Sequence, residues 1–191
     1  MKKLIFALLL GVVILFSASL CLNGLAAKNA QQEHLWLMQT ILPGSVSFTL
    51  EPYAGEDANI RSVHKAENGF VIETVTRGYA DDIRMLIGVS KEGRVTGLVV
   101  ADAHETLGLG SRILTDHVFL SQFLNGTGSF AAATADAFSG ATGEAATGEE
   151  TQVDAISGAT VSSKAVIRCV NSAIAYVTGA DVSSGATSWG G

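Results

Sequence analysis

The chain has 191 residues and a net charge of −6. Once its apolar N-terminal segment is set aside, its length suits one compact domain. Its 12 lysines and arginines form no run, so nucleic acid is excluded as a partner. The four histidines are scattered and the two cysteines lie in unrelated segments, so neither a metal site nor a disulfide framework is indicated.

An apolar, uncharged stretch from Leu4 to about Ala27 follows Lys2 and Lys3 and is long enough to cross a membrane as a helix. It exceeds the about 7–15 apolar residues of a cleaved signal peptide, although Leu25-Ala26-Ala27 leaves cleavage open. We predict a transmembrane anchor over residues 1–27. The positive-inside rule then places the N-terminus in the cytoplasm and the domain on the extracytoplasmic, periplasmic side of the inner membrane.

Residues 28–60 are predicted to form a juxtamembrane helix and loop. Apolar residues recur at helical spacing from Ala30 to Leu42, and Pro43-Gly44 ends the pattern. A short strand is predicted over residues 46–50 and a loop over residues 51–59.

The remaining domain, residues 61–179, begins with the pattern of an antiparallel sheet. Strands are predicted over residues 70–76 and 83–89, where β-branched residues lie between glycine-containing turns. The turn at residues 91–94 returns the chain as a hairpin into a third strand over residues 95–101. The predicted fold class is therefore α+β, an antiparallel sheet with packed helices.

A glycine run, Glu105-Thr106-Leu107-Gly108-Leu109-Gly110, follows the third strand and precedes a helical pattern over residues 113–124. Glycines at such a junction allow the backbone to approach a ligand closely, and an ordinary strand-to-helix turn is the alternative. The run is not a dinucleotide-binding fingerprint, because its third glycine and the βαβ context are missing.

The C-terminal third begins with a segment of biased composition. Residues 126–152 are rich in glycine, alanine and threonine, which predicts a mobile surface segment within the domain. An amphipathic helix follows from Val161 to Val177, directly after Thr160, and Gly179 ends it. Residues 180–191 are predicted to form a disordered tail.

The start of that helix is the candidate site. Asp154 opens a loop in which Ser157-Gly158-Ala159-Thr160 leads directly into the helix. Free backbone N–H groups and the positive end of the helix dipole converge at such a start, which therefore suits a phosphate. The Thr160 hydroxyl could donate a hydrogen bond to a phosphate or be esterified by one, and Lys164 lies one helical turn further on.

The pattern Asp-x-x-Ser-Gly-Ala-Thr occurs three times, ending at Thr142, Thr160 and Thr187. The residues after Thr142 form no apolar face, and only four residues follow Thr187. Thr160 is therefore the one copy that opens a helix able to pack into a core.

These features together resemble the FMN-binding domain family, which is represented by the G subunit of the Rnf electron-transport complex and by the C subunit of the sodium-translocating NADH:quinone reductase. The matching residues are the N-terminal span, Gly78-Tyr79, the glycine run at 105–110, Asp154 to Thr160 with Val161-Ser162-Ser163, and Ala165-Val166. The chain departs from the family at Leu107, where proline is usual.

The resemblance implies FMN joined through its phosphate to Thr160 by a flavin transferase that uses FAD and magnesium. The residues implied to surround it are Asp154, Ser157, Gly158, Ala159, Val161, Ser162, Ser163, Lys164, Glu105, Thr106, Leu107, Gly108 and Leu109. An ionised Glu105 would disfavour the reduced, anionic form of the flavin. The alternative interpretation is that Glu105 caps the following helix or forms a hydrogen bond within the loop. No catalytic residue is implied, since the flavin ring carries the chemistry.

The favoured function is a membrane-bound redox subunit that works beside the other membrane subunits of an Rnf-type complex linking ferredoxin, NAD and ion movement. One alternative is a free-standing, membrane-anchored FMN domain that passes electrons to another extracytoplasmic reductase. The other is a non-redox envelope binding protein in which the Ser-Gly-Ala-Thr loop only starts a helix.

Overall fold

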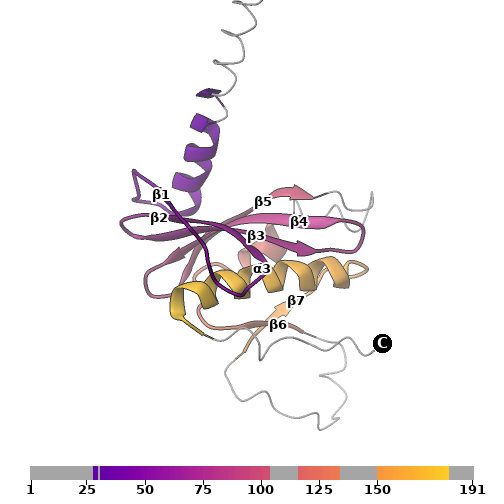
Figure 1. Cartoon of the computed structure of the whole chain (residues 1–191). Coiled ribbons are helices and arrows are strands. Elements are labelled where there is room, and N and C mark those ends of the chain that lie inside the picture. The colour runs from indigo at the N-terminus through magenta and orange to yellow at the C-terminus, as the bar shows by residue number, and fades with distance from the viewer. Residues whose placement is uncertain (1–27, 30, 104–115, 134–149, 181–191) are drawn as a thin grey trace, which may run out of the picture. The chain divides into compact units, whose positions relative to one another are not determined.

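The computed structural model describes residues 28–29, 31–103, 116–133 and 150–180 (Figure 1). The predicted anchor, the glycine run and the predicted tail beyond residue 180 lie outside the described residues. Residues 1–37 and 38–191 form two separate units. Among the described residues, no helix has the length and apolar character needed to cross a membrane.

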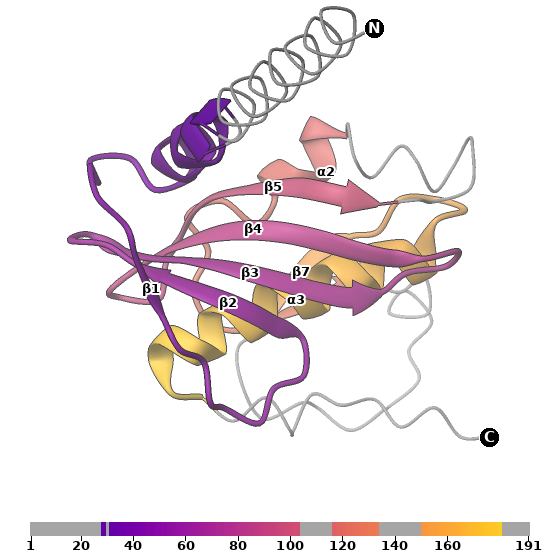
Figure 2. The same ribbon diagram turned by 45° about the horizontal axis from the view of Figure 1, so that its top comes forward.

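A five-stranded antiparallel sheet forms the framework of the second unit, with its strands in the order β1-β2-β3-β4-β5 (Figure 2). The strands are β1 (Thr49–Glu51), β2 (Ile60–Lys65), β3 (Gly69–Arg77), β4 (Asp82–Ser90) and β5 (Val95–Ala103). The three strands predicted over residues 70–101 are thus confirmed as β3, β4 and β5, including the hairpin between the last two. The short strand predicted over residues 46–50 begins only at Thr49.

The strand β2 was not predicted, and its pairing explains why. A register shift between Ile60 and Ser62 interrupts the pairing with β3. The buried residues of β2 are therefore Ile60 and Val63, three positions apart, instead of alternating. The period-2 signal of a half-buried strand is lost at this bulge.

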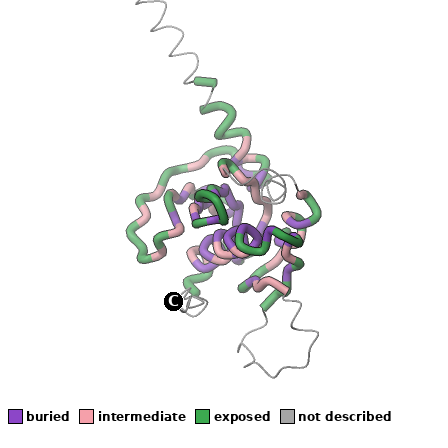
Figure 3. Tube along the Cα trace, turned by 90° about the vertical axis from the view of Figure 1, so that its right-hand side faces the viewer, coloured by how far each residue is buried: buried purple, intermediate pink, exposed green. Residues whose placement is uncertain are grey.

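The helix α3 (Thr160–Thr178) packs against one face of the sheet, where it contacts β3 and β4. Figure 3 shows that buried residues recur along it. Its apolar side joins the main core with Ile72, Met85 and Ile87 of the sheet. Gly179 ends the helix in the left-handed conformation with φ 69°, and its N–H donates to the carbonyl oxygen of Ala175 at 2.8 Å. The predicted helix and its glycine stop are confirmed.

A second, two-stranded parallel sheet pairs β6 (Phe130–Ala133) with β7 (Thr151–Asp154). Both strands lie at the ends of the segment that composition predicted to be a mobile surface region. That prediction is wrong for β6, because Phe130 is 3% exposed and lies in the main core. The last two residues of the segment, Thr151 and Gln152, are exposed, and β7 continues beyond them to Val153, which is fully buried. The predicted fold class included only an antiparallel sheet, so this parallel pair is a feature that the sequence did not predict. The strand β6 also contacts α3.

The helical pattern predicted over residues 113–124 is described from residue 116 on, and only the short helix α2 (His117–Ser121) forms within it. Residues 122–124 form turns, so the helix ends earlier than predicted. Asp116 caps it, since its Oδ1 accepts hydrogen bonds from the N–H groups of Val118 and Phe119 at 3.1 and 3.0 Å. Phe119 and, just after the helix, Phe123 are buried in the main core. The helix is thereby fixed beside the parallel pair.

The opposite face of the large sheet carries a smaller apolar cluster. Residues 31–41 are helical, as predicted, and the end of this segment supplies Met38, Ile41 and Leu42 to the cluster. Strand residues Val71 and Leu86 complete it together with Ala66. Both faces of β3 and β4 are therefore covered over part of their length.

Candidate functional site

The loop between β7 and α3 is shaped by a tight turn. The N–H of Ala159 donates to the carbonyl oxygen of Ile156 at 2.9 Å, which closes the turn around Ser157 and Gly158. Gly158 has φ 78°, a left-handed value that glycine adopts without steric cost. The glycine of the motif is thus required by the turn itself.

The start of α3 is open to an external group. The N-cap residue is Ala159, so no side-chain oxygen caps the first turn of this 19-residue helix. The Thr160 side chain is exposed, and within the described chain no hydrogen bond to its hydroxyl is found. Because the first N–H groups of a helix need acceptors, an alanine cap leaves this end suited to an anionic ligand.

The inner side of the loop is buried and held by α3. The Ser163 hydroxyl accepts a hydrogen bond from the N–H of Ile156 at 3.1 Å, and Ser163 is fully buried. Ala159 and Ser162 are also buried, at 6% and 1% exposure, whereas Val161 is 38% exposed. Ser163 therefore supports the loop from beneath, and Ser162 is buried next to it at the start of the helix.

Gln122 holds the other end of the loop. Its Oε1 accepts from the N–H of Asp154 at 2.8 Å, and its Nε2 donates to the carbonyl oxygen of Asp154 at 3.2 Å. Sequence reasoning missed Gln122. A contact between residues 32 positions apart leaves no local pattern, so no signal in a single sequence could have found it.

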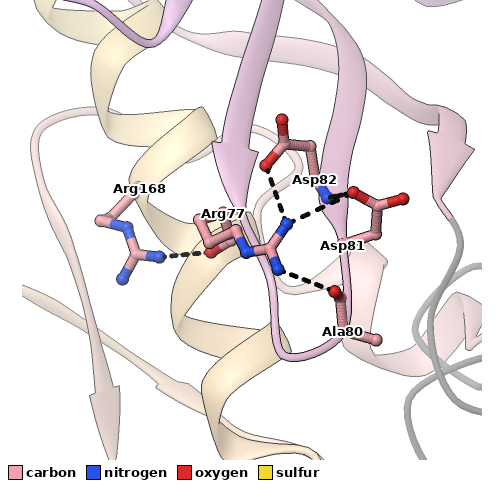
Figure 4. Close-up of polar contacts among 5 residues, drawn as sticks. All are labelled: Arg77, Ala80, Asp81, Asp82 and Arg168. Carbon is pink, nitrogen blue, oxygen red and sulfur yellow. Dashed lines mark hydrogen bonds and ion pairs between the residues drawn. The ribbon is translucent and has the colours of Figure 1, made fainter.

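A network of arginines ties α3 to the turn between β3 and β4 (Figure 4). Arg168 donates through Nη2 to the carbonyl oxygen of Arg77 at 2.9 Å and through Nε to the Thr76 hydroxyl at 3.3 Å. Arg77 in turn donates to the carbonyl oxygen of Ala80 at 2.9 Å and pairs with Asp81 at 3.3 Å. The helix that begins at Thr160 is therefore fixed to the sheet by a main-chain contact.

Lys164 is the cation nearest to Thr160 along the helix. At four residues' separation the two side chains share one helix face. Lys164 is half-buried, and no ion pair involving it is found within the described chain. Its ammonium group is available to balance the charge of a phosphate at the helix start.

An open pocket of about 480 Å³ lies elsewhere on the sheet. It is lined by Arg61, Val75, Asp81, Asp82, Arg84 and Asp102. Val75 and Arg84 alternate along their strands with the buried Thr74, Thr76, Ile83 and Met85, so they project from the face away from α3. Of the predicted site residues that the structure describes, none lines this pocket.

The structure brings together nine of the predicted residues in one continuous loop and helix start. They are Asp154, Ser157, Gly158, Ala159, Thr160, Val161, Ser162, Ser163 and Lys164. The other five, Glu105, Thr106, Leu107, Gly108 and Leu109, lie outside the described residues. Their predicted position beside the flavin stays a prediction.

The residues of the loop fit the phosphate end of a flavin nucleotide. The exposed Thr160 hydroxyl offers an oxygen for esterification, the helix start lacks a side-chain cap, and Lys164 supplies a cation. Gly158 carries no side chain on the exposed side of the turn. These groups are chemically suited to a phosphate.

Comparison with known proteins gives a consistent result. The model of the FMN-binding domain family matches residues 78–175. The G subunit of an ion-translocating oxidoreductase complex from Methanosarcina acetivorans is 35% identical over 153 residues, which cover 74% of this chain and 73% of that protein. The G subunit of the Na(+)-translocating ferredoxin:NAD(+) oxidoreductase complex from Acetobacterium woodii is 35% identical over 107 residues, 56% of this chain and 47% of that protein. The G subunit of an ion-translocating oxidoreductase complex from Pseudomonas aeruginosa is 31% identical over 125 residues, 64% of this chain and 55% of that protein. The chain therefore belongs to the FMN-binding domain family, together with the G subunits of the ion-translocating oxidoreductase complexes.

Proposed function

We propose that this protein is the FMN-carrying electron-transfer subunit of an ion-translocating ferredoxin:NAD oxidoreductase complex of the Rnf type. The family membership and the names of the relatives support this proposal. Its partners are then the other membrane subunits of such a complex. The domain binds no substrate of its own and relays electrons between neighbouring redox centres.

The attachment point in this proposal is the hydroxyl of Thr160. The observation that carries it is the exposed threonine at the first position of α3, behind a turn that requires Gly158 and a helix cap that offers no side-chain oxygen. The oxygens of a phosphate there would accept hydrogen bonds from the N–H groups of the first turn. Lys164 would add an electrostatic contribution from the same face.

The attachment reaction proposed for Thr160 is a transfer from FAD by a magnesium-dependent flavin transferase. A bond forms between Thr160 Oγ1 and the phosphorus that bears the riboflavin group. The pyrophosphate bond of FAD breaks, AMP leaves, and the hydroxyl proton is released. Because the Thr160 side chain is exposed, the oxygen is accessible to such an enzyme without unfolding of the helix.

The flavin ring supplies the redox chemistry when bound, and the protein anchors and orients it. A phosphoester prevents loss of the cofactor outside the cytoplasm, where free flavin would diffuse away. Glu105 to Leu109 are proposed to lie beside the ring. The N-terminal residues 1–27 are proposed to anchor the domain on the extracytoplasmic side of the membrane.

The attachment is tested by co-expressing the full chain with a flavin transferase, denaturing it in acid, and measuring in-gel flavin fluorescence and intact mass. We expect one covalent flavin in the parent protein and none in the Thr160→Val variant. Thr151→Val makes the same change at an exposed position of β7 and should keep the flavin. Flavin that dissociates from the parent protein on denaturation would refute the covalent link.

The topology is tested separately with reporters fused after Gly191. An alkaline phosphatase should be active there and a cytoplasmic reporter inactive. The reverse pattern would contradict the proposed orientation.

A further inference from the structure

We infer that Gln122 is a positioning residue for flavin attachment, because its side chain holds the loop that presents Thr160 in a preformed shape. The inference rests on the proposed attachment of FMN to Thr160. It assigns to the end of α2, a separate element, a part in recognition by the flavin transferase.

The contact has the geometry of a strand pairing. In an extended strand the N–H and the C=O of one residue point to the same side. Asp154 is the last residue of β7, and its N–H and C=O meet Oε1 and Nε2 of Gln122 at 2.8 and 3.2 Å. The amide of Gln122 thus completes the edge of β7 in place of another strand.

The chain on either side of Gln122 is anchored in the core. It lies between Phe119 and Phe123, which are 2% and 0% exposed and whose rings meet edge to face at 5.4 Å. Phe123 also packs against Phe130 at 5.1 Å. These buried neighbours fix the backbone from which the Gln122 side chain reaches Asp154.

The two ends of the loop are therefore fixed by different elements. Gln122 holds the main chain of Asp154, and Ser163 holds the N–H of Ile156. Between them, Ser157, Gly158 and Thr160 face solvent. The Asp154 carboxylate is exposed as well. A transferase thus meets the acid and the threonine of the motif at a fixed spacing.

This arrangement has a matched counterpart on the other strand of the same small sheet. The amide of Asn171 accepts from the N–H of Phe130 and donates to its carbonyl oxygen, both at 2.9 Å. It makes the same two bonds as Gln122 but at the start of β6, away from the attachment loop. A variant of Asn171 therefore serves as a control, because it loses the same two hydrogen bonds without affecting the attachment loop. It distinguishes a local effect on the loop from a general loss of stability.

The experiment compares the full-length Gln122→Met and Asn171→Leu variants, both of which keep the bulk of the side chain and lose both hydrogen bonds. Each is incubated with flavin transferase, FAD and magnesium, and the initial rate of flavin incorporation is measured by intact mass. We expect Gln122→Met to lower the rate per folded molecule about five- to tenfold, as the loss of one or two hydrogen bonds implies. Asn171→Leu should incorporate flavin at the parental rate.

Amide hydrogen exchange of the chains before flavin attachment gives a second readout. Gln122→Met should raise exchange in residues 154–160, and Asn171→Leu should raise it in residues 129–133. A parental rate of incorporation in Gln122→Met, or an equal loss in both variants, would overturn the inference. Failure of the parent protein to acquire flavin at Thr160 would instead refute the proposed function.

Discussion

The guanidinium of Arg168, two turns into α3, donates a hydrogen bond to the carbonyl oxygen of Arg77, the last residue of β3, at 2.9 Å. A second bond from Nε reaches the hydroxyl of Thr76 at 3.3 Å. These contacts fix the helix that begins at Thr160 to the end of a central strand. The position of the attachment point relative to the sheet therefore depends on a polar contact as well as on the apolar core.

Replacing Arg168 by methionine removes both hydrogen bonds and keeps most of the aliphatic stem. Because Arg168 is half-buried, we expect a loss of about 1–2 kcal/mol in the free energy of unfolding, measured by urea denaturation. Arg61→Met is the control, since Arg61 is exposed and no hydrogen bond or ion pair of its guanidinium is found among the described residues. Equal stability of the two variants would show that the contact contributes nothing.

A second prediction concerns the buried hydroxyl beneath the loop. Replacing Ser163 by alanine leaves the buried N–H of Ile156 without its acceptor. We expect destabilisation of about 1–3 kcal/mol. Increased hydrogen exchange should be confined to residues 155–160. Uniformly raised exchange across α3 would contradict this local role.

A third prediction concerns the close contact between Ile41, which belongs to the smaller apolar cluster, and the strands β4 and β5. A Cβ atom on Gly97 would lie 2.7 Å from both the Cα and the carbonyl oxygen of Ile41, and the paired Gly88 also faces that carbonyl. Because main-chain atoms cannot move aside as a flexible side chain can, Gly97→Ala should cost about 1–3 kcal/mol. Thermal unfolding of the full chain measures the loss.

The same position offers a direct check on the cause. Thr96 donates to the Ile41 carbonyl oxygen at 2.6 Å, so Thr96→Val should weaken the same contact without adding a clash. Since both changes act on one contact, the double variant should lose less than the sum of the single losses. Additive losses would show that the two residues act independently.

How far the sequence predicts this structure depends on the range of the interactions. The strands β3 to β5 and the helix α3 could be predicted from local patterns of apolar residues. The end of the helix at Gly179 could be predicted because glycine readily adopts the left-handed conformation that ends a helix. The strand β2 was missed because a bulge removes its alternation. The strands β6 and β7 were missed because their burial depends on Phe130 and Val153 meeting a core built by distant elements.

The candidate site divides in the same way. The loop from Asp154 to Thr160 could be predicted because its turn and its helix start are local properties of adjacent residues. The roles of Gln122 and Arg168 could not, because each binds main-chain atoms of a residue remote in sequence. Almost every residue has a main-chain N–H and a C=O group, so the sequence does not show which residue Gln122 or Arg168 binds.

The last prediction concerns Cys169, which is fully buried on α3 beneath the sheet. Burial raises the pKa of its thiol from 9.0 to about 11, because the thiolate would lose its hydration. The folded chain therefore keeps this proton at pH values where the unfolded chain has released it. The stabilisation, on the order of 2 to 3 kcal/mol, is complete below pH 9 and is lost as the pH rises toward about 11.

The measurement compares the free energy of unfolding of the parent chain and of Cys169→Ala from pH 8 to pH 11. Burial also raises the pKa of Tyr176, which contributes a loss of the same sign, but this residue is present in both proteins. The difference between the two stability curves therefore isolates the thiol and should shrink by about 2 to 3 kcal/mol across this range. A difference that stays constant with pH would mean that the thiolate is tolerated within the core, and hence that water reaches the interface between α3 and the sheet.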